Sequence, residues 1–422
     1  MAMKRVSGLD ALSAGTGVWV LAGPVAAADN SGIVPGLQRL VDSDTDQRVG
    51  LVPDRESMCW IDEQTIDDRY LLSERHIDAS DPVLTLTQAM SEVPVLGVQA
   101  DAAGHHLLVA FNHGIGDAKV MAEVVAELSR SHEETQPAAT SVRVATRRPL
   151  RLAHKTALRT APGAFAAALA CVGARVGREL VGGACRRITG AAGRSRHNDE
   201  LAAAKMSVCY VRSEPSFLGE LTQWRAAHAP DVSTNSILFH RIWHGIHDVG
   251  LDPIGEVELL VDLRRHLPKG ADSDANLAAV SSVRIAADMT AVEFGSRVAD
   301  EMVSLRPLVR AGLASLARNA RNGTRLHQLC APDMPVRPLL TISDISRAPG
   351  ISNIAWHADA TQGAEVQRTF AVALQPGSAE RISLGLCTID GVVHATATFS
   401  PDVVSPEAVE HGISLALNPG RW

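Results

Sequence analysis

The most constraining feature of the sequence is a short glycine-bearing turn that joins an apolar run to an amphipathic helix. Residues 105–111 (HHLLVAF) form the run, and its length and apolar character predict a buried strand. The turn that follows reads Asn112-His113-Gly114-Ile115-Gly116-Asp117-Ala118. Beyond the turn, apolar residues recur at helical spacing: Val120, Met121, Val124, Val125 and Leu128. This order predicts that His113 lies at the end of a strand and Asp117 at the start of a helix.

The turn contains residue types that suit acid–base chemistry. Histidine is the side chain best matched to general-base catalysis near neutral pH. Gly114 and Gly116 allow a tight backbone turn and leave open space beside the imidazole of His113. A purely structural interpretation stays open, in which Asp117 only caps the helix and His113 is a turn residue.

The chain is long enough for two domains, and both halves mix helices with strands. It has 422 residues, of which 46% are apolar and 21% charged, as in ordinary globular proteins. The second half predicts helices after Ser233 and at residues 406–417, and strands at residues 206–211, 256–263, 339–345, 370–374, 382–389 and 393–399. We therefore expect an α+β fold with an N-terminal subdomain at 1–140, a basic helical connector at 141–205 and a C-terminal subdomain at 206–422.

Charge is distributed unevenly along the chain. The net charge is −7 and only 4% of the residues are aromatic, which argues against nucleic acid as a partner. Residues 141–198, in contrast, contain twelve lysines and arginines and a single acidic residue, Glu179. This segment is either a connecting helix with a solvated basic face or a surface for an anionic partner. A CoA nucleotide, an acidic carrier protein and lipid headgroups are the candidate partners.

Other chemistries have weaker support in the sequence. Six scattered cysteines without a C-x-x-C pair predict reduced thiols in a cytoplasmic protein, rather than disulfides or structural zinc. No uncharged run reaches the roughly 18 residues that span a bilayer. His240, His244 and His247 share one face of a predicted helix, but their spacing completes no known metal motif, and we expect no metal.

The turn resembles the HHxxxDG motif of the CoA-dependent acyltransferase superfamily. That group includes chloramphenicol acetyltransferase, peptide-synthetase condensation domains, polyketide-associated acyltransferases and wax ester synthases. In this chain Asn112 replaces the first histidine, His113 matches the second, and Ala118 replaces the glycine after Asp117. The resemblance implies an α+β fold of two chloramphenicol acetyltransferase-like subdomains with an active-site tunnel between them.

Further segments resemble the same family in the same order along the chain. They are residues 5–11 (RVSGLDA), similar to the opening of wax ester synthase chains; residues 261–264 (VDLR), a strand that ends in Arg264; Asn276; and residues 341–344 (TISD), which contain Ser343 and precede Pro349-Gly350. Together these segments cover nearly the whole chain.

The resemblance implies a role for each of these residues. His113 would take the proton from an acceptor hydroxyl or amine, which then attacks an acyl thioester directly, without an acyl-enzyme. Asp117 would point away from the substrate and pair with Arg264, and Gly116 would be a structural member of the motif. The candidates for binding the tetrahedral oxyanion or the substrate are Ser343, Asn276 and Asn112.

We therefore expect an acyltransferase that moves an acyl group from a CoA or carrier-protein thioester to a hydroxyl of a lipid or natural product. It would need no cofactor besides the thioester substrate, and it would act as a monomer on a hydrophobic alcohol or amine. The basic segment leaves peripheral contact with a membrane open. Two alternatives stay open: a stand-alone condensation enzyme that forms an amide from carrier-bound substrates, and a non-catalytic relative that scaffolds an assembly or binds a ligand.

Overall fold

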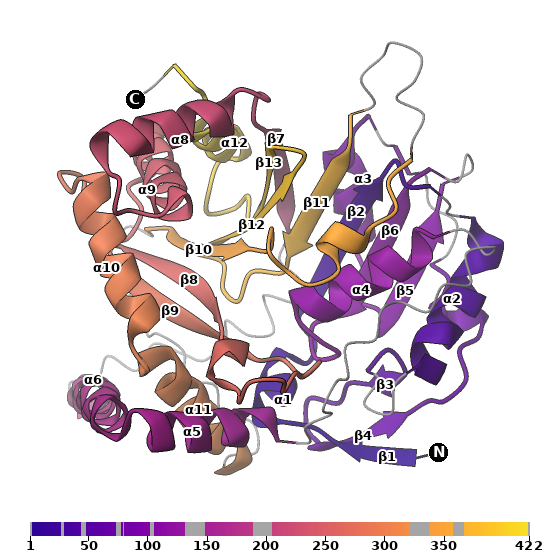
Figure 1. Cartoon of the computed structure of the whole chain (residues 1–422), viewed down its shortest axis with the longest axis horizontal. Coiled ribbons are helices and arrows are strands. Elements are labelled where there is room, and N and C mark those ends of the chain that lie inside the picture. Colours follow the sequence, from indigo (N-terminus) through magenta and orange to yellow (C-terminus); the bar gives the residue numbers. More distant parts are fainter. Residues whose placement is uncertain are drawn as a thin grey trace.

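Two main β-sheets lie next to each other, and each is covered by helices (Figure 1). The computed structural model of the chain describes residues 2–26, 29–43, 48–72, 77–78, 80–101, 105–130, 148–188, 205–320, 337–357 and 367–420. Helices and strands alternate along both halves, and the predicted α+β class is confirmed.

The larger sheet belongs to the second half and has six strands. In spatial order they are β7 (Ser207–Arg212), β13 (Val392–Phe399), β12 (Arg381–Ile389), β10 (Leu339–Asp344), β8 (Glu256–Asp262) and β9 (Ala278–Arg284). Strands β12, β10 and β8 are parallel, and the outer pairs are antiparallel. Alternate residues of β8 and β10 face the helices that cover the sheet, because the side-chain period of a strand is two. These helices are α8 (Phe217–His228), α9 (Thr234–Ile246), α10 (Ala291–Val303) and α12 (Pro406–Ala416).

The second sheet has four antiparallel strands and contains the strand that leads into the turn. In spatial order they are β11 (Thr369–Leu374), β2 (Gly17–Gly23), β6 (Leu107–Asn112) and β5 (Leu96–Ala100). Helices α2 (Asn30–Ser43) and α4 (Ala118–Leu128) pack on one face, and α3 (Pro82–Ala89) packs on the other. Both faces are therefore buried, and strand β6 reads as a continuous apolar run.

Strand β11 departs from the predicted division of the chain into subdomains. Its residues were expected within the C-terminal subdomain at 206–422, but β11 pairs with β2 in the sheet of the first half. The physical reason is its apolar sequence. Phe370 and Val372 enter one core cluster, while Ala371 and Ala373 enter the cluster on the opposite face. At the edge of this sheet, β11 can bury the side chains of both its faces, one pair in each core cluster.

A small third sheet and the connector complete the architecture. The sheet consists of β1 (Ala2–Arg5), β4 (Cys59–Asp62) and β3 (Leu51–Val52). Helix α1 (Gly8–Ser13) follows β1 and packs on α11 (Arg306–Ala320) of the second half. Within the predicted connector, α5 (Pro149–Thr160) and α6 (Pro162–Ile188) also pack on α11. Residues 141–147 and 189–204 of the connector lie outside the described residues.

No single helix in the described part of the chain is long and apolar enough to cross a membrane. Helix α5 and residues 162–175 of α6 reach the required length and composition only as a pair, and a bend of 120° separates them.

The strands and helices predicted around the turn and in the second half are confirmed to within about two residues at their ends. Ser233 caps α9, as expected, by accepting a hydrogen bond from the backbone N–H of Ser236. Asp390 and Gly391 have φ angles of 50° and 81°. Positive φ at both central residues is what a two-residue hairpin turn of type I′ requires.

The crossing of α9 and α12 provides a test of the packing. A Cβ atom added at Gly245 would lie 2.1 Å from the backbone oxygen of Gly412. Because backbone atoms cannot move aside cheaply, we expect Gly245→Ala to lower the free energy of unfolding by about 1–3 kcal/mol. Gly219 in α8 has no heavy atom within 4 Å of the same position, so Gly219→Ala should leave stability unchanged or raise it by ~0.5–1 kcal/mol. Urea unfolding of both variants measures the difference, and equal midpoints would contradict this packing.

Candidate active site

The turn between β6 and α4 presents His113 at the end of an inner strand of the four-stranded sheet. The side chains of residues 107–111 are all buried, whereas Asn112 and His113 at the end of the strand are half-buried. Helix α4 begins at Ala118, and Asp117 is its N-cap, accepting a hydrogen bond from the backbone N–H of Lys119 at 3.1 Å. The predicted order of strand, turn and helix is therefore present.

Asn112 and the two glycines determine the shape of the turn. The Oδ1 atom of Asn112 accepts hydrogen bonds from the backbone N–H groups of Gly15 (2.8 Å) and Gly114 (3.0 Å). A Cβ atom at Gly114 would lie 2.9 Å from the ring of Trp60, and one at Gly116 would lie 2.5 Å from the side chain of Val120. The turn therefore needs glycine at both positions because of close packing.

Backbone carbonyls of the turn are held by side chains from distant segments. The side-chain amide of Asn276 donates to the carbonyl oxygens of His113 (2.7 Å) and Gly114 (3.3 Å). The guanidinium of Arg48 donates to the carbonyl oxygens of Ile115 (2.5 Å) and Gly114 (3.2 Å). These four hydrogen bonds hold the backbone of the turn, which carries His113.

Asp10 joins these two side chains to the start of the chain. Its Oδ1 accepts a hydrogen bond from the backbone N–H of Asn276 at 2.9 Å and forms an ion pair with Arg48 at 2.8 Å. Its Oδ2 accepts from the backbone N–H of Ser7 in a capping box at the start of α1. The segment at 5–11, which resembles the family in sequence, therefore contacts through Asp10 the two residues that hold the turn.

Asp117 and Arg264 form the ion pair that the sequence led us to expect. The guanidinium of Arg264 donates to both carboxylate oxygens of Asp117, at 2.9 and 3.1 Å. The side chains are 13% and 9% exposed. Burial alone would raise the pKa of Asp117, but the charge and hydrogen bonds of Arg264 outweigh it, and the pKa of this carboxyl lies below its usual value. The backbone N–H groups of Leu277 and Lys119 act in the same direction.

A second buried ion cluster lies next to this pair and was not predicted. Lys119, in the first turn of α4, is 2% exposed and pairs with Asp272 at 2.5 Å and with Asp274 at 2.6 Å. A lysine within an apolar helix face, together with the acidic segment at 271–276 (ADSDAN), was the signal available in the sequence. Both clusters connect α4 of the first half to the loop between β8 and β9.

The imidazole of His113 makes no hydrogen bond within the described part of the chain. Its Nδ1 is enclosed and has no hydrogen-bond partner among the described residues. The neighbouring side chains of Asn276 and Arg48 donate to backbone carbonyls of the turn and not to the imidazole. The other ring nitrogen, Nε2, is not among the enclosed atoms and makes no hydrogen bond within the described part of the chain, so a ligand proton can reach the ring from that side.

The other candidate residues have different surroundings. Ser343 lies in β10 opposite Gly385 and is half-buried, and no hydrogen bond joins it to His113 within the described part of the chain. Its neighbour Asp344 accepts hydrogen bonds from Asn235 and from Ser346. The amide groups of Asn276 and Asn112 hold the backbone of the turn, and a contact of either residue with substrate stays a prediction.

The histidines of α9 make their contacts within the second half of the chain. The Nε2 atom of His240 donates a hydrogen bond to the backbone carbonyl of Met289 at 2.8 Å, and the centre of its ring lies 4.2 Å from that of His244. Among the described residues, no three His, Cys, Asp or Glu side chains are grouped so that they would hold a metal. The tunnel between the halves stays a prediction. The cavity beside α9 and the cavity between α6, α10 and α11 are both lined by residues outside the turn.

Comparisons with known proteins agree on the fold. No family model and no curated protein sequence matches the chain. Among solved structures, the cyclization-docking bidomain of the EpoB peptide synthetase from Sorangium cellulosum matches with a TM-score of 0.60 and 11% identity, over 99% of this chain and 83% of that one. Polyketide synthase associated protein 5 from Mycobacterium tuberculosis matches with a TM-score of 0.52 and 12% identity, over 99% and 98%.

A third solved structure matches over nearly the full length of both chains. TRI101 of F. graminearum, solved with coenzyme A and deoxynivalenol, matches with a TM-score of 0.55 and 14% identity, over 95% of both chains. Identities this low show the fold and no more. The chain has the two-lobed fold that condensation-type domains of peptide synthetases share with CoA-dependent acyltransferases, which confirms the resemblance indicated by its sequence.

Proposed function

We propose that this protein is an acyltransferase that moves an acyl group from a thioester to a hydroxyl group, with His113 as the general base. The observation that carries the proposal is the construction of the turn. Asn276 and Arg48 hold its backbone, Asp117 is turned away onto Arg264, and the imidazole of His113 is left without a hydrogen bond to the described protein. Such an arrangement fixes one proton acceptor and leaves it unoccupied.

The proposed reaction needs one group that moves a proton and one that stabilises charge. His113 takes the proton from the acceptor O–H, because a neutral alcohol is a poor nucleophile. The oxygen attacks the thioester carbonyl and forms a tetrahedral oxyanion. Collapse breaks the carbon–sulfur bond and gives the ester, and the leaving thiolate takes the proton back from the imidazolium of His113. The oxyanion needs hydrogen-bond donors, for which we propose Ser343.

Solved structures with the same fold support this choice of chemistry. TRI101 was solved with coenzyme A and with the alcohols deoxynivalenol and T-2, and TRI3 is described as a trichothecene 15-O-acetyltransferase. We propose that this chain likewise uses an acyl-CoA or acyl-carrier thioester and a hydrophobic alcohol.

A second candidate is amide formation from carrier-bound substrates. It is favoured by the similarity to the EpoB bidomain and to the condensation domain of the MokA polyketide synthase. The same base would then take a proton from an amine. Turnover assays that compare acyl-CoA with acyl-carrier protein, and alcohols with amines, separate the two candidates.

Removal of the base should abolish turnover without unfolding the protein. We expect His113→Ala to lower the rate of thiol release from acyl-CoA by about 10²–10⁴-fold, because the acceptor keeps its proton. Its circular dichroism and melting temperature should match the wild type, since the imidazole makes no hydrogen bond to the described protein. His411→Ala on the exposed side of α12 is the control. Equal turnover in both variants would show that the mechanism is wrong.

The ion pair should act on stability, with a defined dependence on pH. We expect Arg264→Ala to lower the free energy of unfolding by about 3–5 kcal/mol, because it leaves Asp117 buried and unpaired. The pKa of Asp117 is lowered by folding, so its contribution is complete above the unfolded value of about 4 and is lost as the pH falls through the folded value.

Asp117→Asn tests this sign. The variant should be less stable than the wild type at pH 7, and the difference should shrink as the pH falls below about 4. Urea unfolding at a series of pH values measures it. A stable Arg264→Ala variant that is selectively inactive would place Arg264 at the substrate instead.

A further inference from the structure

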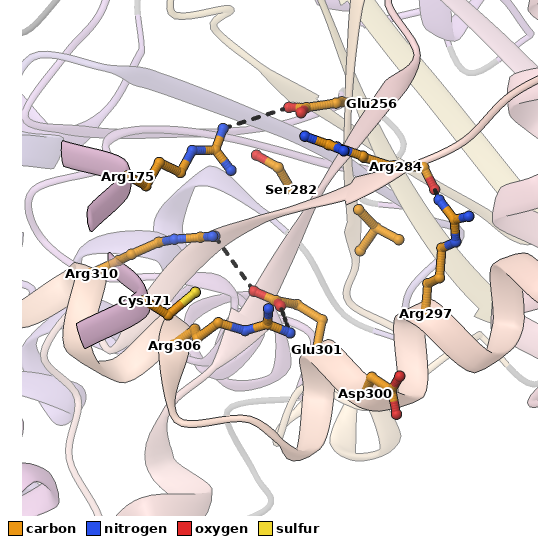
Figure 2. Close-up of a pocket in the computed structure, with 11 residues that line it drawn as sticks. Cys171, Arg175, Glu256, Ser282, Arg284, Arg297, Asp300, Glu301, Arg306 and Arg310 are labelled. Atoms are coloured by element: carbon orange, nitrogen blue, oxygen red, sulfur yellow. Dashed lines mark hydrogen bonds and ion pairs between the residues drawn. The ribbon is translucent and has the colours of Figure 1, made fainter. Parts of the chain in front are cut away.

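A cavity lined by five arginines lies between the connector and the second half. Its volume is about 650 Å³, within the usual range for small-molecule sites. The arginines come from four elements: Arg175 from α6, Arg284 from β9, Arg297 from α10, and Arg306 and Arg310 from α11. Figure 2 shows their guanidinium groups arranged around one space, with α6 and α11 on one side and α10 on the other.

Carboxylates in the lining balance only part of this positive charge. The cavity contains three of them, Glu256, Asp300 and Glu301, so the lining has a net charge of +2. Arg306 and Arg310 both pair with Glu301, at 2.5 and 3.5 Å, and Arg175 lies 3.7 Å from Glu256 (Figure 2).

Two arginines have no ion pair among the described residues. The side chain of Arg284 is exposed and makes no hydrogen bond there. Arg297 donates to the backbone carbonyl of Arg284 at 3.4 Å and is also exposed. Their charges are therefore available to a ligand.

The environment of Arg310 shows the effect of gathering these charges. Burial lowers its pKa, Glu301 opposes the shift, and the positive charges of Arg175 and Arg306 lower the pKa further. An anion in the cavity would relieve this repulsion. All five cations are arginines, whose planar fork donates two hydrogen bonds to one phosphate or carboxylate. The lining therefore suits a ligand that carries more than one phosphate.

The position of the cavity relates it to the turn. The backbone N–H of Leu277 donates to Asp117 at 3.3 Å, and β9 begins at the next residue. Ser282 and Arg284, which line the cavity, lie five and seven residues further along this strand. At ~3.3 Å per residue the separation from the turn is roughly 17–23 Å. The pantetheine arm of CoA, about thirteen bonds from sulfur to phosphorus, spans roughly 15 Å when extended, which is close to the shorter of these two separations and below the longer one.

We infer that this cavity, here called the arginine pocket, binds the 3′-phosphate and diphosphate of CoA, so that the acyl donor is a CoA thioester rather than an acyl-carrier protein. This inference rests on the proposed function and names its donor. A carrier-linked phosphopantetheine has one phosphate, which is bound in a diester, whereas CoA brings three phosphate groups to the five arginines. The connector takes part through Arg175, so part of its basic character serves this ligand.

The test measures binding of CoA to the full chain by calorimetry, with the double variant Arg284→Gln/Arg297→Gln. We expect the Kd for CoA to rise by about 10-fold per arginine, since each charge-assisted hydrogen bond contributes on the order of one tenfold step. The melting temperature should stay unchanged, because neither side chain forms an ion pair in the described protein. Arg39→Gln on α2, whose side chain is 46% exposed, is the matched control and should leave the Kd as it is.

Two further ligands identify the source of the phosphates. Pantetheine, which lacks the phosphates, should bind equally weakly to wild type and variant, and 3′,5′-ADP should lose affinity in the variant as CoA does. If CoA affinity is the same in the wild type and the double variant, the inference is wrong. If ADP or ATP binds as tightly as CoA, the pocket is a site for free nucleotides and the assignment to the donor fails.

Binding also separates this inference from the proposed reaction. CoA should bind to His113→Ala with the affinity of the wild type, because the phosphate site and the base lie apart. Arginine-dependent CoA binding without any thioester turnover would support the pocket and overturn the proposed function. Turnover that depends on His113 but not on Arg284 and Arg297 would support the proposed function and overturn the assignment of the arginine pocket.

Discussion

The buried ion pair between Asp117 and Arg264 joins the two halves of the protein at the turn. Each charge would be costly without the other in a site that is about nine-tenths buried. Arg264 also donates to the backbone carbonyls of Ser273 (2.8 Å) and Ala275 (3.0 Å). The pair therefore orders the loop that brings Asn276 to the carbonyl of His113. The position of the proposed base thus depends on an arginine that does not contact it.

This dependence explains why the motif tolerates its two departures from the family pattern. Asn112 stands where the family has a histidine, and its Oδ1 accepts hydrogen bonds from the backbone N–H groups of Gly15 and Gly114, so it helps to shape the turn. Ala118 replaces the glycine after Asp117 at the first residue of α4, where alanine favours the helix. Residues 112 and 118 thus support the backbone. The imidazole of the motif, that of His113, makes no hydrogen bond within the described part of the chain.

The sequence predicted the fold class, the turn and the Asp117–Arg264 pair, because local hydropathy patterns and one motif carry that information. It missed the contacts that depend on long-range packing. Nothing near Arg48 indicates that it would reach the carbonyls of Gly114 and Ile115, some 66 positions away. Nothing in the pattern of α4 indicates that Asp272 and Asp274 would neutralise Lys119 in the interior. The net charge of −7 likewise concealed the arginine pocket, whose five cations come from four separate elements.

A crystal structure with a CoA thioether, in which a methylene group prevents cleavage of the acyl chain, tests the proposed acyl transfer at His113 most directly. The account predicts that the position of the thioester carbonyl lies beside the imidazole, leaving room for an acceptor oxygen within about 2.6–3.2 Å of a ring nitrogen. It also predicts that the phosphates lie among Arg284 and Arg297. An acyl end bound elsewhere, with His113 facing no ligand, would contradict it.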